Sequence, residues 1–87
     1  MFILKIVNEP IKVMAIFHPN KKIENGKIEL IKFRFEDKVV RVQKVVKIYE
    51  ESIVGNKRIV FVCQQTDGNL YELKYEIDSK EWYLFKK

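Results

Sequence analysis

Few side chains in this 87-residue sequence are of the types that perform covalent or acid-base catalysis. It contains one histidine, His18, together with two serines, one threonine and one cysteine. A nucleophile must lie within hydrogen-bond reach of a base, and His18 stands where a predicted strand enters a turn, as an exposed loop histidine would. Glu72 and Glu76 alternate with apolar residues, which indicates one solvated strand face rather than a catalytic carboxylate pair. We therefore expect a protein that is not an enzyme.

Cofactor and metal sites are not predicted either. Cys63 is the only cysteine, so neither a disulfide nor a thiolate zinc site can form within one chain. The three glycines, at positions 26, 55 and 68, each fall at a predicted turn and form no phosphate-binding loop. We expect Cys63 to be a small buried strand residue, and we predict no cofactor, no metal and no small-molecule substrate.

Basic side chains carry the strongest functional signal. Residues 1–47 hold eleven Lys and Arg against five Asp and Glu, a net charge of +6, whereas residues 48–87 hold six against seven, a net charge of −1. Cations on one strand pair can neutralise the phosphates of a nucleic acid in salt-sensitive contacts. This predicted basic ribbon consists of Lys32, Arg34, Arg41, Lys44 and Lys47. The alternative is that Glu72 and Glu76, on the next strand, neutralise the ribbon inside the folded sheet.

Aromatic residues near the C-terminus favour two different functions. Bases of a single-stranded nucleic acid stack on exposed rings, for which Tyr49, Trp82, Tyr83 and Phe85 are candidates. The same C-terminal rings, Trp82, Tyr83 and Phe85, also suit a surface that docks another protein or a second copy of the chain by its face or its edge. The leading hypothesis is a module that binds single-stranded nucleic acid through residues 32–47, and the alternative is a protein-interaction or homo-oligomeric module.

Strands must position these side chains. Apolar and charged residues alternate over residues 71–77 and again over residues 11–17, the period of a half-buried strand. Further strands are predicted at residues 2–7, 59–63 and 82–85. The segment 59–63 is apolar on both faces, which is typical of a central strand.

Two segments depart from simple alternation. In residues 27–35 the apolar positions change parity, which indicates a bulge near Leu30 and Ile31. Residues 39–49 match strand and helical periods alike, and their five valines favour a strand.

Turn chemistry sets the register of the hairpin that precedes residues 71–77. A two-residue Asp-Gly turn would place Cys63 opposite Glu72, so apolar side chains of one strand would face charged side chains of the other. A three-residue loop at 66–68, with Gly68 in the left-handed region, places Cys63 opposite Tyr71 instead. We therefore predict the three-residue loop.

The hairpin that carries the basic ribbon has a two- or four-residue loop, since either length pairs Phe33 with Val40. This register sets Lys32 directly opposite Arg41, and like charges that oppose each other across a ladder are unfavourable. Another interaction should offset the repulsion between these two cations. The turn around residues 78–80 fits either parity.

These elements predict an all-β fold. Five to seven short strands form an antiparallel meander that closes into a small, partly open barrel or a strongly curved sheet, SH3-like or OB-like, because open edges invite aggregation. A chain of this length with 47% apolar and 33% charged residues makes one small domain, residues 1–87.

The sequence also bears on location. Its longest apolar runs are about five residues, whereas a membrane helix needs roughly twenty. The N-terminus lacks the basic segment and the cleavage site of a secretory signal. We expect a cytoplasmic protein with no membrane partner.

Several segments resemble a group of short bacterial proteins of unknown function. They are residues 9–13 (EPIKV), 31–35 (IKFRF), 56–61 (NKRIVF), 71–75 (YELKY) and 82–84 (WYL). Longer relatives of that group, with a similar aromatic and basic strand followed by a valine-rich strand, appear beside or within error-prone DNA polymerases. The resemblance implies a DNA-related context, and it transfers no catalytic or binding residue.

Overall fold

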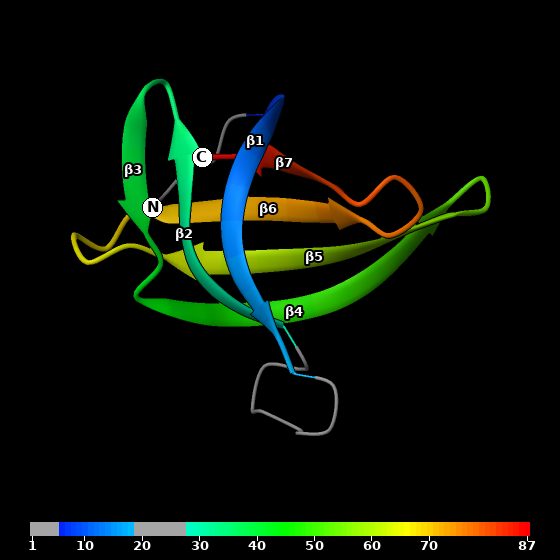
Figure 1. The fold of residues 1–87 in the computed structure, drawn as a ribbon, viewed down its shortest axis with the longest axis horizontal. Coiled ribbons are helices and arrows are strands. Elements are labelled where there is room, and N and C mark those ends of the chain that lie inside the picture. Colours follow the sequence, from blue (N-terminus) through cyan, green and yellow to red (C-terminus); the bar gives the residue numbers. More distant parts are fainter. Residues whose placement is uncertain (1–5, 19–27) are drawn as a thin grey trace.

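Seven antiparallel strands form one sheet in the computed structural model, which describes residues 6–18 and 28–87. The strands are β1 (Ile6–Phe17), β2 (Ile28–Phe35), β3 (Lys38–Arg41), β4 (Lys44–Ile53), β5 (Asn56–Gln64), β6 (Leu70–Glu76) and β7 (Glu81–Lys86). Their order in the sheet is β3-β2-β1-β7-β6-β5-β4, and the sheet curls into a half-barrel (Figure 1). The predicted all-β fold with a strongly curved, partly open sheet is therefore confirmed. The described residues include no helix that is long and apolar enough to cross a membrane.

β1 joins two runs of consecutive hairpins, β1 to β3 and β4 to β7. Its first half, residues 6–11, pairs with β7, and its second half pairs with β2. The ladder with β7 is irregular between Ile6 and Glu9, where Asn8 has a φ of 51°, and such a bulge bends a strand. In Figure 1, β1 and β2 cross the strands β4 to β6 at a steep angle. Residues 2–5 of the predicted strand 2–7 lie outside the described residues.

Both predicted hairpin registers are present. Cys63 lies opposite Tyr71, and the backbone N–H of Gly68, at a φ of 92°, donates to the carbonyl of Gln65 at 2.9 Å, which closes the predicted three-residue loop. In the ribbon hairpin, Lys32 lies opposite Arg41 across a two-residue turn. The register is set locally in each case, because a slip of one residue would turn every apolar side chain away from the core.

Two finer expectations are resolved. The β1–β2 register shifts so that Met14 opposes Lys32 while Ala15 opposes Leu30, which confirms the predicted bulge at Ile31. The undecided turn between β6 and β7 is four residues long, because Glu76 pairs with Glu81.

The prediction of one continuous strand over residues 39–49 is wrong, although a strand rather than a helix is correct. The N–H of Val42 donates to the carbonyl of Ile31 at 3.0 Å, and the next N–H, from Gln43, donates to the carbonyl of Gln64 at 2.9 Å. The backbone thus changes partner between adjacent residues, from β2 to β5. The curl of the sheet allows this exchange, because it brings the opposite edges β3 and β4 close enough for one peptide unit to join them (Figure 1).

The core fills the inside of the curl. Phe61, Leu73 and Leu84 stand side by side on β5, β6 and β7 and are fully buried. The other buried members of this cluster are Ile28, Leu30, Phe33, Val40 and Cys63. Since β2 and β3 supply four of the eight buried residues of the cluster, the outer faces of these strands are left for polar side chains.

Candidate nucleic-acid interface

Four positively charged side chains lie together on the outer face of β1, β2 and β3. Lys12 pairs with Arg34, and Lys32 pairs with Arg41. Residues that oppose each other across a ladder share one face, and so do residues two apart on one strand. Phe33 lies between Lys32 and Arg34 and is buried on the other side of the sheet. We call Lys12, Lys32, Arg34 and Arg41 the basic face.

The basic face has two apolar neighbours on the same side of the sheet. Val39 opposes Arg34 on β3, and Met14 opposes Lys32 on β1. Val39 and Met14 are 49% and 54% exposed, so they are large apolar side chains presented among the cations. Strands lie roughly 5 Å apart and residues two apart on a strand roughly 7 Å, so the four cation-bearing Cα atoms fall within about 12 Å.

None of the carboxylates in the described residues forms an ion pair with this face. The ion pairs among those residues join Arg58 to Glu76, Lys74 to Glu51 and Lys87 to Glu36, and Glu29 is hydrogen-bonded to His18. Lys32 and Arg41 nevertheless oppose each other directly, an arrangement that costs folding free energy. Their charge is therefore available to an anion from outside the described chain.

The alternative in which Glu72 and Glu76 neutralise the ribbon is wrong for its members on β2 and β3, Lys32, Arg34 and Arg41. Both residues are on β6, which β7 and β1 separate from β2 in the sheet. The carboxylate of Glu76 lies 3.4 Å from Arg58 and accepts a hydrogen bond from the hydroxyl of Ser79. Glu72 opposes Val62 on one side and Lys86 on the other. Glu72 therefore shares a face with Lys47 across β5, and both acidic residues lie away from the basic face.

The predicted ribbon is divided by the exchange of strand partners. Lys32, Arg34 and Arg41 belong to the basic face, whereas Lys44 and Lys47 lie on β4 and pair with β5. The structure adds Lys12, which the prediction missed. The alternation around Lys12 marks an outward residue of a strand, but no local signal shows that this strand lies beside β2.

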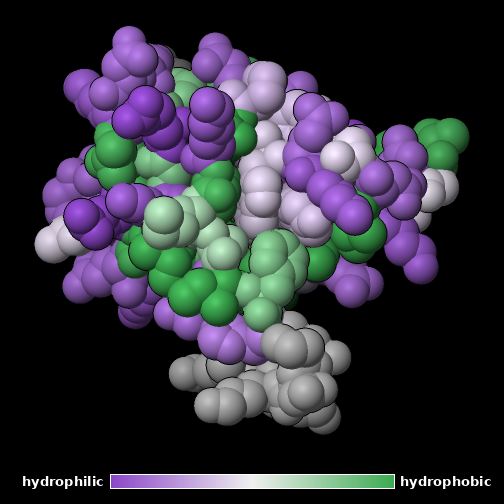
Figure 2. Space-filling view, in the orientation of Figure 1, coloured by the Kyte–Doolittle hydropathy of each residue, from purple (hydrophilic) through white to green (hydrophobic). Residues whose placement is uncertain are grey.

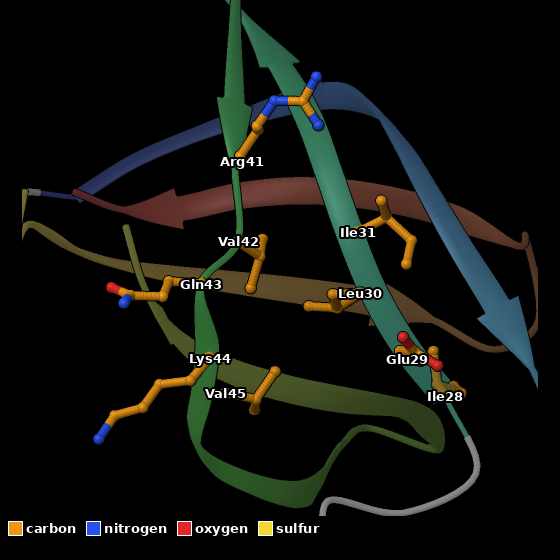
Figure 3. Close-up of a pocket in the computed structure, with 9 residues that line it drawn as sticks. All are labelled: Ile28, Glu29, Leu30, Ile31, Arg41, Val42, Gln43, Lys44 and Val45. Carbon is orange, nitrogen blue, oxygen red and sulfur yellow. The ribbon is translucent and has the colours of Figure 1, made fainter. Parts of the chain in front are cut away.

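A gap opens where β3 ends and β4 begins, next to the basic face. It has a volume of about 450 Å³. It is lined by Ile28, Glu29, Leu30, Ile31, Arg41, Val42, Gln43, Lys44 and Val45. Leu30, Val42 and Val45 extend into the space between the strands, while Gln43 and Lys44 point away from it (Figure 3). In the view of Figure 2, hydrophobic surface covers the lower part of β2, and hydrophilic surface covers the upper parts of β2 and β3.

Comparisons of the chain with protein-family models, with curated proteins and with solved structures give no match.

The predicted aromatic surface lies at the centre of the sheet. β7 is paired with β1 on one side and with β6 on the other, so docking by its edge is not available. The ring of Trp82 packs 4.6 Å from that of Tyr75, and the ammonium of Lys74 lies 3.6 Å from the centre of the Phe85 ring. Tyr83 is half-buried on the same strand. Docking by the face of Trp82, Tyr83 and Phe85 stays a prediction.

Among the predicted stacking residues, Tyr49 on β4 has the freest ring. Its side chain is 37% exposed, and the ammonium of Lys47 lies 5.2 Å from the ring centre. Burial and the nearby charges of Glu72 and Glu51 raise the pKa of the Tyr49 hydroxyl, so it stays neutral well above pH 7. Tyr49 and Lys47 therefore occupy a surface of mixed charge.

His18 and Cys63, two of the residues considered for catalysis, each form a local hydrogen bond. His18 Nε2 lies 3.0 Å from Glu29 Oε1, at the end of β1 beside β2. The Cys63 thiol is buried and donates to the carbonyl of Tyr71 at 3.6 Å, and its burial raises its pKa to about 12. Within residues 6–18 and 28–87, no three His, Cys, Asp or Glu side chains gather where they would hold a metal ion.

Proposed function

We propose that this chain is a small β module that binds single-stranded nucleic acid through the basic face and acts by binding rather than by catalysis. One observation carries the proposal: four cations share one face of three adjacent strands, and no described carboxylate pairs with them. Opposed like charges destabilise a free sheet. A phosphate backbone that lies across them offsets this cost and releases its counterions.

Exposed apolar side chains beside the cations support a single strand as the ligand. The phosphates of a single strand can contact the cations while its bases turn toward apolar surface. Met14 and Val39 offer such surface among the cations, and the apolar gap adjoins Arg41. The DNA-related context that the resemblance implies points the same way.

Fluorescence anisotropy with a short labelled oligothymidine, long enough to contact one protomer, tests the proposal. Four contacts to a single strand predict a slope of about −3 in a plot of log affinity against log salt, a loss of roughly 50-fold between about 50 and 200 mM salt. A duplex of the same length should compete weakly. Affinity that does not depend on salt, or no binding at low salt, contradicts the proposal.

Matched variants separate the basic face from general positive charge. Lys32→Gln with Arg34→Gln should reduce the slope to about −1.4, because two of four phosphate contacts are lost. Lys57→Gln with Lys80→Gln removes the same charge from two exposed lysines, one on β5 and one in the β6–β7 turn, and should leave the slope unchanged. Equal losses in the two double variants would show that the chain holds nucleic acid by net charge alone.

A further inference from the structure

β4 is an edge strand with one side unused by the described residues. It pairs with β5 along its whole length, from Lys44 opposite Gln64 to Ile53 opposite Asn56, and it stands last in the sheet. Its other side therefore presents a row of backbone N–H and C=O groups. Such an edge is a template for another strand.

Apolar side chains are exposed along this edge. Val46 is 53% exposed, Tyr49 37% and Ile53 47%, and Val54 in the adjoining turn is 98% exposed. The ladder irregularity that would twist the edge away from a neighbour lies between Val45 and Lys47, so the rest of β4 pairs regularly. The regular part of the edge, residues 47–53, is the part that another strand can extend.

The charge pattern of β4 identifies the strand that fits. Its cations, Lys44 and Lys47, come in the first half, and its carboxylates, Glu50 and Glu51, come in the second. An antiparallel copy of the same strand sets the first half of one strand against the second half of the other, so Lys47 can meet a carboxylate of the partner. We propose that β4 pairs with β4 of a second copy of this chain around a two-fold axis at Tyr49.

Side-chain parity selects this register. Lys47, Tyr49 and Glu51 share the outer face of β4, because they are two residues apart. A two-fold axis perpendicular to the sheet keeps outer faces together, so with Tyr49 opposite the partner's Tyr49, Lys47 opposes the partner's Glu51. A shift of two positions loses both charge pairs, since Lys47 would then oppose either the partner's Tyr49 or the partner's Ile53. The Tyr49 register is therefore the one that sets Lys47 opposite the partner's Glu51 on both sides, where this carboxylate, which already accepts hydrogen bonds from Lys74 of its own chain, faces a second ammonium group.

The assembly closes as a dimer. The same patch serves both copies, which is the isologous interface of a two-fold dimer, and its formation uses up the β4 edge. The remaining sheet edge, β3, is only four residues long. The dimer joins two sheets side by side and leaves the basic face of each copy uncovered, because that face lies on β1 to β3.

Sedimentation equilibrium of the full chain is the first test. We expect a concentration-dependent dimer that weakens with salt, and Lys47→Glu should weaken it by at least about tenfold because it turns two attractive pairs into repulsive ones. Lys80→Glu, the same charge change in the β6–β7 turn, should leave the dimer unchanged. Oligothymidine binding by the Lys47→Glu monomer should persist, so failure of the dimer and failure of nucleic-acid binding are separable.

A charge swap provides the second test, in a Lys74→Met background that removes the ammonium held by Glu51. Lys47→Glu alone and Glu51→Lys alone should each weaken the dimer. An equimolar mixture of the two variants should restore it, because both cross-strand pairs are then attractive again. No restoration would overturn the proposed register.

Cross-linking locates the axis. Tyr49→Cys places two thiols directly opposite each other, at a separation that a disulfide spans, and mild oxidation should give a covalent dimer. Cys63 is buried with a raised pKa and should not contribute. Lys80→Cys should give no such product. A chain that stays monomeric at all concentrations, or a dimer that neither responds to Lys47→Glu nor cross-links through Tyr49→Cys, overturns the proposal and points to another surface, such as the aromatic face of β7.

Discussion

Lys74 on β6 donates hydrogen bonds to both carboxylate oxygens of Glu51 on β4, at 2.9 and 3.1 Å, across the intervening strand β5. Lys74 is only 7% exposed, and its ammonium lies 3.6 Å from the centre of the Phe85 ring. A buried ammonium is tolerated when its charge is paired and its hydrogen bonds are made. The strand face that alternation predicts to be solvated is thus partly closed over by an ion pair and a ring.

Removing the carboxylate from this pair should cost stability. Glu51→Gln leaves the Lys74 ammonium buried beside a neutral amide, and the expected loss is about 2–3 kcal/mol, below the range for a fully buried pair because Glu51 is partly exposed. Lys74→Met removes the charge, keeps an apolar contact with Phe85 and should change the free energy of unfolding by less than about 1 kcal/mol. Urea denaturation of both variants measures this asymmetry, and equal losses would contradict it.

Arg41→Glu should separate stability from binding. The new carboxylate opposes Lys32, so a repulsive cross-strand pair becomes attractive and the free energy of unfolding should rise by about 0.2–1 kcal/mol at low salt. Affinity for oligothymidine should fall, because a phosphate contact becomes a repulsion. Thermal denaturation and anisotropy measure the two effects. Lys38→Glu is the control, because Lys38 opposes Phe35 rather than a cation. A loss of both stability and binding in Arg41→Glu would show that Arg41 is structural.

Local features of the chain were sufficient to predict the hairpins. The 66–68 loop, the parity change at Ile31 and the opposition of Lys32 and Arg41 depend on residues within about a dozen positions of one another. In such hairpins the loop length and the buried face together leave one register. The overall curvature follows from the need to bury the apolar face of a short chain without leaving long open edges.

Long-range pairing was not predictable in the same way. Residues 39–49 carry a valine-rich pattern that suits one strand, and nothing in it marks the peptide unit at Val42 and Gln43 where the partner changes from β2 to β5. That exchange depends on the curl of the whole sheet, as does the pairing of β1 with β7. The grouping of the cations was consequently predicted in part: Lys32, Arg34 and Arg41 share one face as expected, Lys44 and Lys47 lie apart from them on β4, and Lys12 was missed.

Cys63 should be inert in the folded protein and should make stability fall at alkaline pH. Burial raises the pKa of its thiol from 9.0 to about 12, so the folded state keeps it neutral where the unfolded chain ionises it. Its contribution to the free energy of unfolding is therefore complete below pH 9 and is lost as the pH rises toward 12. The measurement is the difference in unfolding free energy between the natural chain and Cys63→Ala across this range.

The difference in unfolding free energy between the natural chain and Cys63→Ala also controls for other groups that titrate at alkaline pH. Burial raises the pKa values of Tyr49 and Tyr71 too, and both tyrosines are present in the two proteins, so their effects cancel. A thiol reagent at about pH 8 should label Cys63 only as fast as the chain unfolds. A constant stability difference up to pH 12, or rapid labelling of the folded protein, would show that the thiol is accessible.

Lys12 and Lys47 give the sharpest test of where the nucleic acid lies. Lys12 belongs to the basic face through its pairing with Arg34, whereas Lys47 lies on β4 beside Tyr49. Lys12→Gln should therefore reduce the salt slope of oligothymidine binding by about 0.7, the value for one phosphate contact, as Arg34→Gln should. Lys47→Gln should leave the slope unchanged when the oligonucleotide is short enough to contact one protomer. The two lysines carry the same charge and differ only in the strand that presents them. A lower slope for Lys47→Gln together with an unchanged slope for Lys12→Gln would therefore move the site to β4 and exclude the basic face.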